Sequence, residues 1–442
     1  MSARHTAHDA SASGEARRDP GPSARFRIRE GLVQPAVAAV ATAYDAPIAA
    51  TDPILVSGVA PERFPTFEGL RALCALAIVA FHAGTFTGLT GPGGSAAGSW
   101  VRHLNVGVSV FFVLSAFLLY RPFVVAHLRD EPGPRLGPYL ARRATRVYPA
   151  YWVALFVTAV VLDQAVLGDW WGKLRFYSLT QIYWGDTALG GLPQAWSLCT
   201  EVSFYLVLPL WAALLARVGG DAERRRRAHL AGCVAWYVGG LAFRAALRAG
   251  DHALGYAWLP ANTDLFALGM VLAVVSAGAA TGAREPGGLW RTIGERPAAA
   301  WLAALCAFWA VTQMGFPYEF LQTPTVGEEL GRQVLFGVVA VLLVAPGVLG
   351  PQDEGVGRRL LAARPLWALG IVSYGIYLWH LTAMVELDER LSAAPGPDGV
   401  AGPPSWWALV LLSAVASAAV AAVSWFALER PTLRRVRRGT WR

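Results

Sequence analysis

The sequence predicts an all-α membrane protein that crosses the bilayer about ten times around a polar intramembrane cavity. Of its 442 residues, 55% are hydrophobic and only 15% are charged, whereas soluble domains carry charge on about a quarter. The mean hydropathy is +0.40. Ten apolar runs each approach the roughly 17–25 residues that a transmembrane helix needs. They lie near residues 69–88, 105–127, 148–167, 196–216, 229–248, 258–280, 298–316, 331–350, 366–386 and 405–428. Lipid offers the backbone no hydrogen-bond partners, so each run is expected to be helical.

Charge in the loops predicts the orientation. Arginines gather in the connections after the even-numbered runs and in the C-terminal tail, for example in the stretches 224–227 and 434–438. Few basic residues follow the odd-numbered runs, namely Arg102, Lys173, Arg175 and Arg390. Positively charged loops stay in the cytoplasm, which places both termini there and the protein in the cell membrane. The same pattern explains the net charge of +8 without a nucleic-acid partner.

The chain divides into three parts. Residues 1–60 are rich in Ser, Ala, Pro and Arg and lack the order of a signal peptide, so we predict a disordered cytoplasmic arm. Residues 61–431 hold the transmembrane domain, and 432–442 form a basic cytoplasmic tail. The four cysteines lie in apolar segments without metal-ligand spacing, so we predict that they are packing residues and that no metal site is present.

Ionisable residues from five runs fall at a similar depth, towards the outer side. Such groups are costly in lipid and usually face a polar cavity. The five are His82, Glu201, Arg244, Asp264 and His380. Ser197 and Tyr205 share a helical face with Glu201, and Ser373 and Tyr377 share one with His380. This convergence favours an enzyme over a channel.

Simpler readings exist for each of these residues. A lone histidine within a membrane is often just hydrogen-bonded to a neighbouring helix. Glu201 and Arg244 would also suit a structural ion pair. The rival function is a transporter or exporter of a sugar or lipid, in which the buried charges form a path and no group is transferred.

Motifs along the chain occur in the order of a known family. They are EGLRALCALAIVAFHA with Arg71 and His82, NVGVSVFFVLSAFLLYRPF at 105–123, ARRATRVYPAYW at 141–152 with an RxxR formed by Arg143 and Arg146, WSLCTEVSFYLVLP at 196–209, NTDLFALG at 262–269, SYGIYLWH at 373–380 and ERP at 429–431. From Phe64 to Pro431 the sequence resembles the membrane-bound acyltransferase-3 family.

Two departures and one missing part set this sequence apart from family members. They commonly have an acidic residue where Ser109 stands and glycine where Ala116 stands. Many also carry a hydrolase-like domain after the last span, so we expect any second-step chemistry to come from elsewhere.

The resemblance implies a bacterial O-acyltransferase that modifies carbohydrates or related compounds. The donor would be a cytoplasmic acyl-CoA, with acetyl as the simplest acyl group, used as a co-substrate without a permanently bound cofactor. The acceptor would be a hydroxyl of a sugar, a glycan or a natural product such as a macrolide.

Physical chemistry suggests roles for the matching residues. Arg143 and Arg146, three residues apart, can reach the same anion, and guanidinium groups bind phosphate in paired hydrogen bonds. A neutral histidine can take a proton from a hydroxyl near neutral pH, so His82 is expected to be a general base, or else to carry the acyl group itself. We expect Arg71 and Arg142 to help bind the donor, and Glu201 to orient His82 or to hold acceptor hydroxyls. Arg244 and Asp264 are expected to complete the cavity. The residues expected to shape the acceptor end are Ser197, Tyr205, Ser373, Tyr377 and His380.

Overall fold

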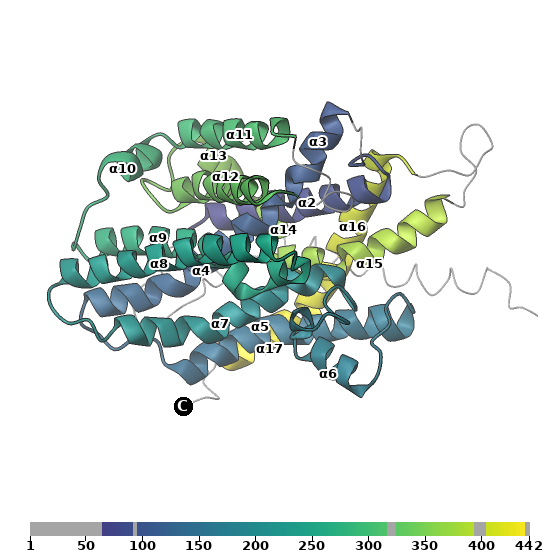
Figure 1. Ribbon diagram of the computed structural model, residues 1–442, viewed down its shortest axis with the longest axis horizontal. Helices are drawn as coiled ribbons and strands as arrows, with labels where there is room; N and C mark the ends of the chain where they lie inside the picture. The colour runs from purple at the N-terminus through teal and green to yellow at the C-terminus, as the bar shows by residue number, and fades with distance from the viewer. Residues whose placement is uncertain (1–63, 92–94, 316–323, 393–403, 438–442) are drawn as a thin grey trace, which may run out of the picture. The chain divides into compact units, whose positions relative to one another are not determined.

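The fold consists of helices throughout the part of the chain that the structure, a computed structural model, describes (Figure 1). That part comprises residues 64–91, 95–315, 324–392 and 404–437. No strand occurs in these ranges, which confirms the predicted all-α class. The predicted arm at 1–60 and residues 438–442 lie outside them.

Within the described residues, each predicted run overlaps a helix, and α14 and α15 share one run. These helices are α2 (Thr66–Phe86), α4 (Val106–Leu128), α5 (Leu136–Phe156), α7 (Trp196–Leu215), α8 (Ala222–Ala249), α9 (Thr263–Ala280), α11 (Pro297–Gln313), α12 (Val326–Val344), α14 (Arg364–Ile371), α15 (Ser373–Ser392) and α16 (Trp406–Ser424). Helices outside the predicted runs are α3 (Ala96–Arg102), α6 (Trp170–Tyr177), α10 (Gly288–Glu295), α13 (Val356–Leu361) and α17 (Arg430–Arg437). Single turns of π-helix extend α5 at Val157–Val161 and α16 at Trp425–Glu429.

Eight helical segments among the described residues are long and apolar enough to cross a membrane. A bent pair, α14 with α15, makes a ninth candidate, and the 17-residue α11 occupies the place of the remaining predicted run. Every predicted run therefore has a helix, and the protein is a multi-pass membrane protein. The prediction of ten spans counts the bent pair and α11 as full crossings.

Local sequence signals explain where several helices start. Thr325 and Glu328 form a capping box, in which each side chain accepts a hydrogen bond from the other residue's backbone N–H at the start of α12. Asp221 caps α8 by accepting from the backbone N–H of Arg224 at 2.7 Å. Ser405 caps α16 in the same way.

Helix α4 forms the centre of the bundle and packs against α9. Val113, Phe117 and Tyr120 of α4 are fully buried. The two backbones approach so closely that a Cβ at Gly269 would lie 2.2 Å from the carbonyl oxygen of Val113. Small residues permit such contacts between membrane helices. Ala116 also faces Gly269, so the family departure at this position belongs to the α4–α9 interface.

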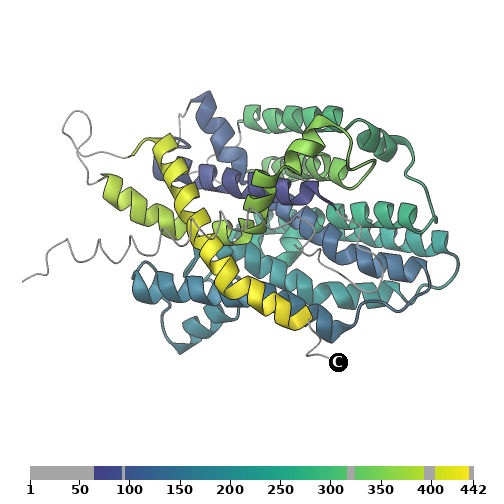
Figure 2. The ribbon, with the colours of Figure 1, turned by 180° about the vertical axis from the view of Figure 1, so that it is seen from behind.

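A bend of 69° separates α14 from α15. The Ser373 hydroxyl at the bend donates to the carbonyl of Gly370 at 2.7 Å. Seen from behind, α16 passes through its π-helical turn into α17 (Figure 2). The first part of the predicted basic tail is thus helical as far as Arg437.

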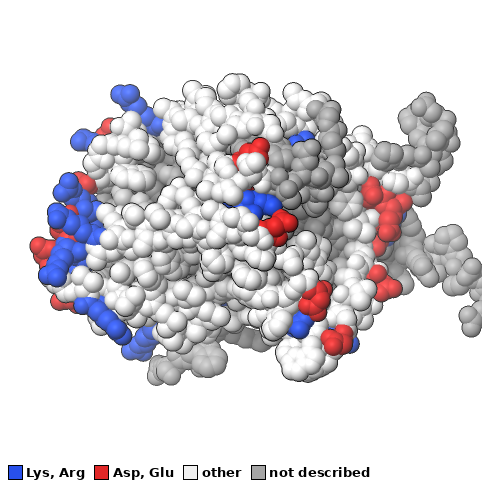
Figure 3. Space-filling view, in the orientation of Figure 1, with Lys and Arg blue, Asp and Glu red and all other residues white. Residues whose placement is uncertain are grey.

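Charged residues divide between the two ends of the face in Figure 3. Arginines gather at the end where α8 and α10 begin, and the side chains of Arg227 on α8 and Arg291 on α10 are exposed. Acidic residues predominate at the opposite end, where α15 finishes near Glu389. This is the asymmetry that the loop sequences predict.

Candidate functional site

A cavity of about 140 Å³ opens between helices α2, α4, α5, α7 and α15 and extends to Pro134 in the α4–α5 loop. Nine of the thirteen predicted site residues line it. They are Arg71, Arg142, Arg143, Arg146, Ser197, Glu201, Tyr205, Ser373 and Tyr377. Aromatic and aliphatic side chains, mainly from α4, complete the wall. The structure thus brings most of the predicted residues from separate runs to one place.

The arginines of α5 form the cationic part of the wall. Arg142, Arg143 and Arg146 lie on consecutive turns of the helix and all face the cavity. Arg143 lies over the ring of Tyr205, 6.0 Å from its centroid. Thr145 donates to the backbone carbonyl of Arg142, but among the described residues none forms a hydrogen bond or ion pair with the guanidinium group of Arg142 or Arg146. These two guanidinium groups therefore keep their hydrogen-bonding capacity for a ligand.

Two buried polar atoms of the wall also lack partners within the described ranges, the Nε of Arg143 and the hydroxyl of Tyr139. Buried polar groups are nearly always hydrogen-bonded, so such atoms indicate that the cavity accommodates a polar molecule or water. Tyr139 lies one turn before Arg143 on α5, and its hydroxyl extends the polar surface. Sequence reasoning missed this residue because tyrosine in an interfacial helix ordinarily anchors it in the bilayer.

Glu201 is the only carboxylate in the cavity wall among the described residues. It accepts a short hydrogen bond from the hydroxyl of Ser115 on α4. No hydrogen bond joins Glu201 to His82 within the described structure, so its contact is with α4 and not with the imidazole. Ser115 interrupts an apolar run, which was the signal available in the sequence. The other family departure, Ser109, is buried on α4 and does not line the cavity.

Ser197 and Tyr377 connect α7 with α15 at the far side of the cavity. Their hydroxyl oxygens lie 2.7 Å apart. The Tyr377 hydroxyl donates to the carbonyl of Gln194, so Ser197 must donate to Tyr377. A second lining tyrosine, Tyr374, donates to the carbonyl of Val147 at 2.8 Å and ties α15 to α5.

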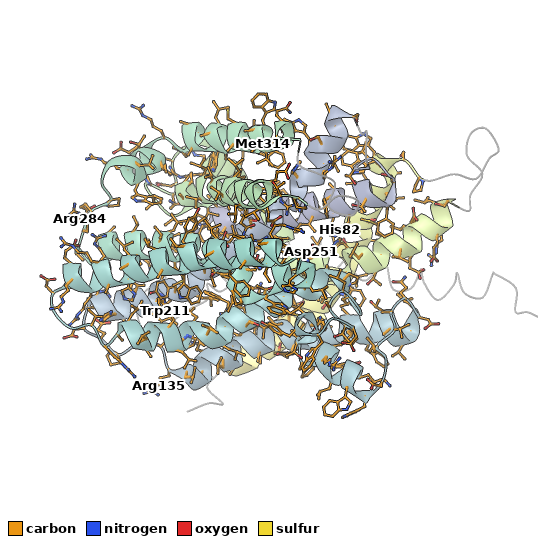
Figure 4. The ribbon with its side chains drawn as sticks, viewed as in Figure 1. His82, Arg135, Trp211, Asp251, Arg284 and Met314 are labelled. Carbon is orange, nitrogen blue, oxygen red and sulfur yellow. The ribbon has the colours of Figure 1, made fainter. Side chains whose placement is uncertain are left out.

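His82 and His380 form a pair beside the cavity but do not line it. The Nε2 atom of His380 lies 3.1 Å from Nδ1 of His82. His380 is fully buried, and its Nδ1 donates to the carbonyl of the lining residue Tyr377 at 2.7 Å. His82 is partly exposed and lies away from the end that carries Arg135 and Arg284 (Figure 4). The pair therefore adjoins the end of the cavity formed by Ser197 and Tyr377.

Arg244 and Asp264 lie in a second polar cluster and not in the cavity wall. Arg244 donates to Glu329 at 2.5 Å, and Gln333 donates to Asp264 at 2.9 Å. Both partners belong to α12. The structural ion pair of Arg244 is therefore formed with Glu329 and not with Glu201, as the sequence suggested. The expectation that Arg244 and Asp264 complete the cavity rested on their depth in the membrane, and residues at the same depth can lie on different sides of a helix bundle. Glu329 preceded the predicted run, but the capping box at Thr325 starts α12 earlier and buries it.

Metal-binding groups of three or more His, Cys, Asp or Glu side chains are absent from the described ranges. Three of the cysteines are buried and contribute to packing, whereas Cys306 on α11 is exposed. The prediction that all four cysteines are packing residues is therefore wrong for Cys306 in the isolated chain.

Membrane-length helices around a polar cavity with an arginine-rich wall define a multi-pass membrane protein with an internal polar cavity. The chain belongs to the family described as "Acyltransferase domain", which matches residues 64–423. This match covers almost the whole described bundle and agrees with the predicted family.

The relatives have low sequence identity to this chain, but each match covers most of it. YrhL of Bacillus subtilis (strain 168), provisionally named a peptidoglycan O-acetyltransferase, is 26% identical over 83% of this chain and 54% of its own length. O-acetyltransferase OatA of Staphylococcus aureus (strain NCTC 8325) is 22% identical over 74% of this chain and 52% of its own. Acyltransferase MdmB of Streptomyces mycarofaciens is 27% identical over 74% of this chain and 81% of its own. The chain spans about half the length of the first two. No solved structure matches it.

Proposed function

We propose that this protein transfers an acyl group, most simply acetyl, from a cytoplasmic acyl-CoA to a hydroxyl of a sugar, glycan or natural product. The observation that carries the proposal is a single cavity that runs from the arginines of α5 to Ser197 and Tyr377, beside the pair of His82 and His380. Membership of an acyltransferase family supports group transfer. Two relatives named as O-acetyltransferases support a hydroxyl acceptor.

The donor enters from the basic end, which is then the cytoplasmic end, with both termini on that side. CoA carries phosphates, and Arg142, Arg143 and Arg146 offer cationic donors along one face of α5. Arg71 extends this surface from α2, although it also lies 3.6 Å from Glu68. A cavity of about 140 Å³ is small beside the roughly 300–1,000 Å³ of typical ligand sites. It accommodates the thin acyl thioester end while the nucleotide stays at the basic rim.

The reaction takes place at the end of the cavity formed by Ser197 and Tyr377, which the histidine pair adjoins. His82 accepts the proton of the acceptor hydroxyl as the oxygen attacks the thioester carbonyl carbon. The tetrahedral intermediate then collapses, the C–S bond breaks, and the CoA thiolate recovers the proton from His82. The alternative is a covalent route in which His82 first takes the acyl group and then passes it to the hydroxyl. An acyl-imidazole trapped during turnover distinguishes this route from direct transfer.

Labelled acetyl-CoA tests the proposal. The full chain is reconstituted in nanodiscs with [14C]acetyl-CoA and three acceptors: peptidoglycan glycan strands, methyl glucoside and a macrolide. We expect alkali-labile label on at least one acceptor, and loss of this label in His82→Ala. Arg135→Gln is the matched control, because Arg135 is exposed and does not line the cavity.

A transporter would give the opposite result in proteoliposomes. The acceptor would cross the membrane without gaining label, and His82→Ala would not alter acetyl transfer because none would occur. Absence of label from every acceptor, together with acceptor movement, would overturn the enzyme assignment. The buried charges of Arg244 and Glu329 are paired with each other and do not favour a transport path.

A further inference from the structure

The two histidines belong to helices that are far apart in the sequence, α2 and α15, and their rings meet beside the cavity. Their ring centroids are 4.9 Å apart. His82 Nδ1 lies 3.0 Å from the carbonyl oxygen of Ile78 and 3.1 Å from Nε2 of His380. His380 Nδ1 lies 2.7 Å from the carbonyl oxygen of Tyr377. Three of the four ring nitrogens therefore have a defined partner.

These contacts determine where the hydrogens lie on two neutral rings. A carbonyl oxygen only accepts hydrogen bonds, so the nitrogen that faces it must carry the hydrogen. Nδ1 of His380 therefore carries the hydrogen of that ring, and its Nε2 is a lone-pair acceptor. Nδ1 of His82 carries the hydrogen of the other ring and shares it between the Ile78 carbonyl and His380 Nε2. The Nε2 atom of His82 is left with a lone pair.

We infer that His380 is a positioning residue, which accepts a hydrogen bond from His82 Nδ1 and so holds His82 in the tautomer whose Nε2 is free to act. This inference rests on the proposed function, because the free Nε2 is the atom that takes the acceptor's proton or the acyl group. When Nε2 gains a proton, the positive charge of the ring is stabilised by the same Nδ1–H hydrogen bond. His380 cannot pass the proton on, because its own Nδ1–H is held by a carbonyl.

His380 accepts a hydrogen bond from His82, as a carboxylate does from the catalytic histidine of many hydrolases, but it carries no buried negative charge. In those enzymes an aspartate orients the imidazole and fixes its tautomer. Among the described residues, no carboxylate forms a hydrogen bond with either ring here. Burying a carboxylate at this depth would carry a large desolvation cost. A neutral imidazole supplies the acceptor without that cost.

Two substitutions of similar size separate positioning from packing. Glutamine at 380 places an amide oxygen near the former Nε2 atom, whereas the shorter asparagine does not reach His82. We expect His380→Asn to lower kcat about 10- to 100-fold, which corresponds to losing one hydrogen bond to a charged group. The KM for acetyl-CoA should be unchanged, and His380→Gln should recover much of the loss.

The matched control is His229→Asn, which disrupts a second histidine pair, between the partly buried His127 and the buried His229 at 2.9 Å. His229 lies outside the cavity wall, so its replacement should leave kcat unchanged. Equal losses in His380→Asn and His380→Gln would overturn the positioning role, as would an unchanged kcat in His380→Asn.

Nitrogen-15 NMR of histidine-labelled protein tests the tautomer directly and without turnover. The chain has eight histidines, and spectra of His82→Asn and His380→Asn assign the two signals. We expect a protonated Nδ1 and an unprotonated Nε2 for both neutral rings. A neutral His82 protonated on Nε2 would overturn the inference. Because this readout needs no acceptor, it decides the inference even if labelled acetyl-CoA reveals no transfer and the proposed function fails.

Discussion

Replacing Arg142 by glutamine gives the sharpest test of the donor site. Arg142 lines the cavity, and no described residue forms a hydrogen bond or ion pair with its guanidinium group. The substitution therefore breaks no internal hydrogen bond or ion pair of the side chain, and a change in donor affinity reports what the guanidinium gives to a ligand. Hydrogen bonds to charged groups contribute about 1.5–3 kcal/mol when shielded. Arg142 is partly exposed, and solvent weakens the interaction to about 1–1.5 kcal/mol.

That free energy corresponds to an about five- to twelvefold fall in kcat/KM for acetyl-CoA, carried mainly by KM. The assay follows initial rates of labelled acetyl transfer in nanodiscs at several KCl concentrations. The effect should shrink as salt rises, because the charges are partly screened.

Acetyl-pantetheine provides the internal comparison, because it has the same thioester without phosphate. Arg142→Gln should leave its kcat/KM nearly unchanged, and the exposed Arg135→Gln should affect neither donor. Equal losses for acetyl-CoA and acetyl-pantetheine would refute phosphate recognition by Arg142. The loss would then reflect a change in the shape of the cavity.

Three further predictions concern the helices around the cavity. Glu329→Gln leaves the Arg244 guanidinium buried without its carboxylate, so the free energy of unfolding in detergent should fall by about 3–5 kcal/mol, seen as a lower melting temperature. Tyr377→Phe removes a hydroxyl with two buried partners, so kcat should fall about 5- to 150-fold, which corresponds to about 1–3 kcal/mol. Gly269→Ala forces α4 and α9 apart, and should lower the free energy of unfolding by about 1–3 kcal/mol.

The two stability predictions each have a control in the same chain. Arg291 and Glu295 form an exposed pair, so Glu295→Gln should leave the melting temperature nearly unchanged. Gly137 has open space around its Cβ position, so Gly137→Ala should be tolerated where Gly269→Ala is not. For Tyr377→Phe, an unchanged kcat would contradict a role for its hydroxyl at the reacting end of the cavity.

The sequence predicted the helices well because span length and apolar composition are local properties. It could not predict the bend between α14 and α15, since no proline stands at Val372 where the helices meet. Proline at 365 occupies the first turn of α14, a position that helices tolerate. The bend is set by packing against other helices, which a single sequence does not reveal.

The sequence predicted only in part which candidate site residues lie together in the cavity. Spacing placed Ser197, Glu201 and Tyr205 on one face of α7, and all three line the cavity. Which helix lies opposite that face depends on the arrangement of the bundle, so Ser115 was missed as the partner of Glu201. His82 and His380 are 298 positions apart in the chain, so their contact could not be predicted from the spacing of residues within one helix.

The pairing of Arg244 with Glu329 also constrains how the chain is assembled during synthesis. The two residues are 85 positions apart, so at about 5–20 residues per second α8 waits roughly 4–17 s for its counter-charge to be made. An arginine deep in a lone helix costs about 2.5–3.5 kcal/mol on insertion scales. Arg244 lies five residues before the end of α8 at Ala249, so its long side chain can reach the lipid headgroups in the interval. When α12 is made, Glu329 supplies the counter-charge, and the ion pair joins α8 to α12.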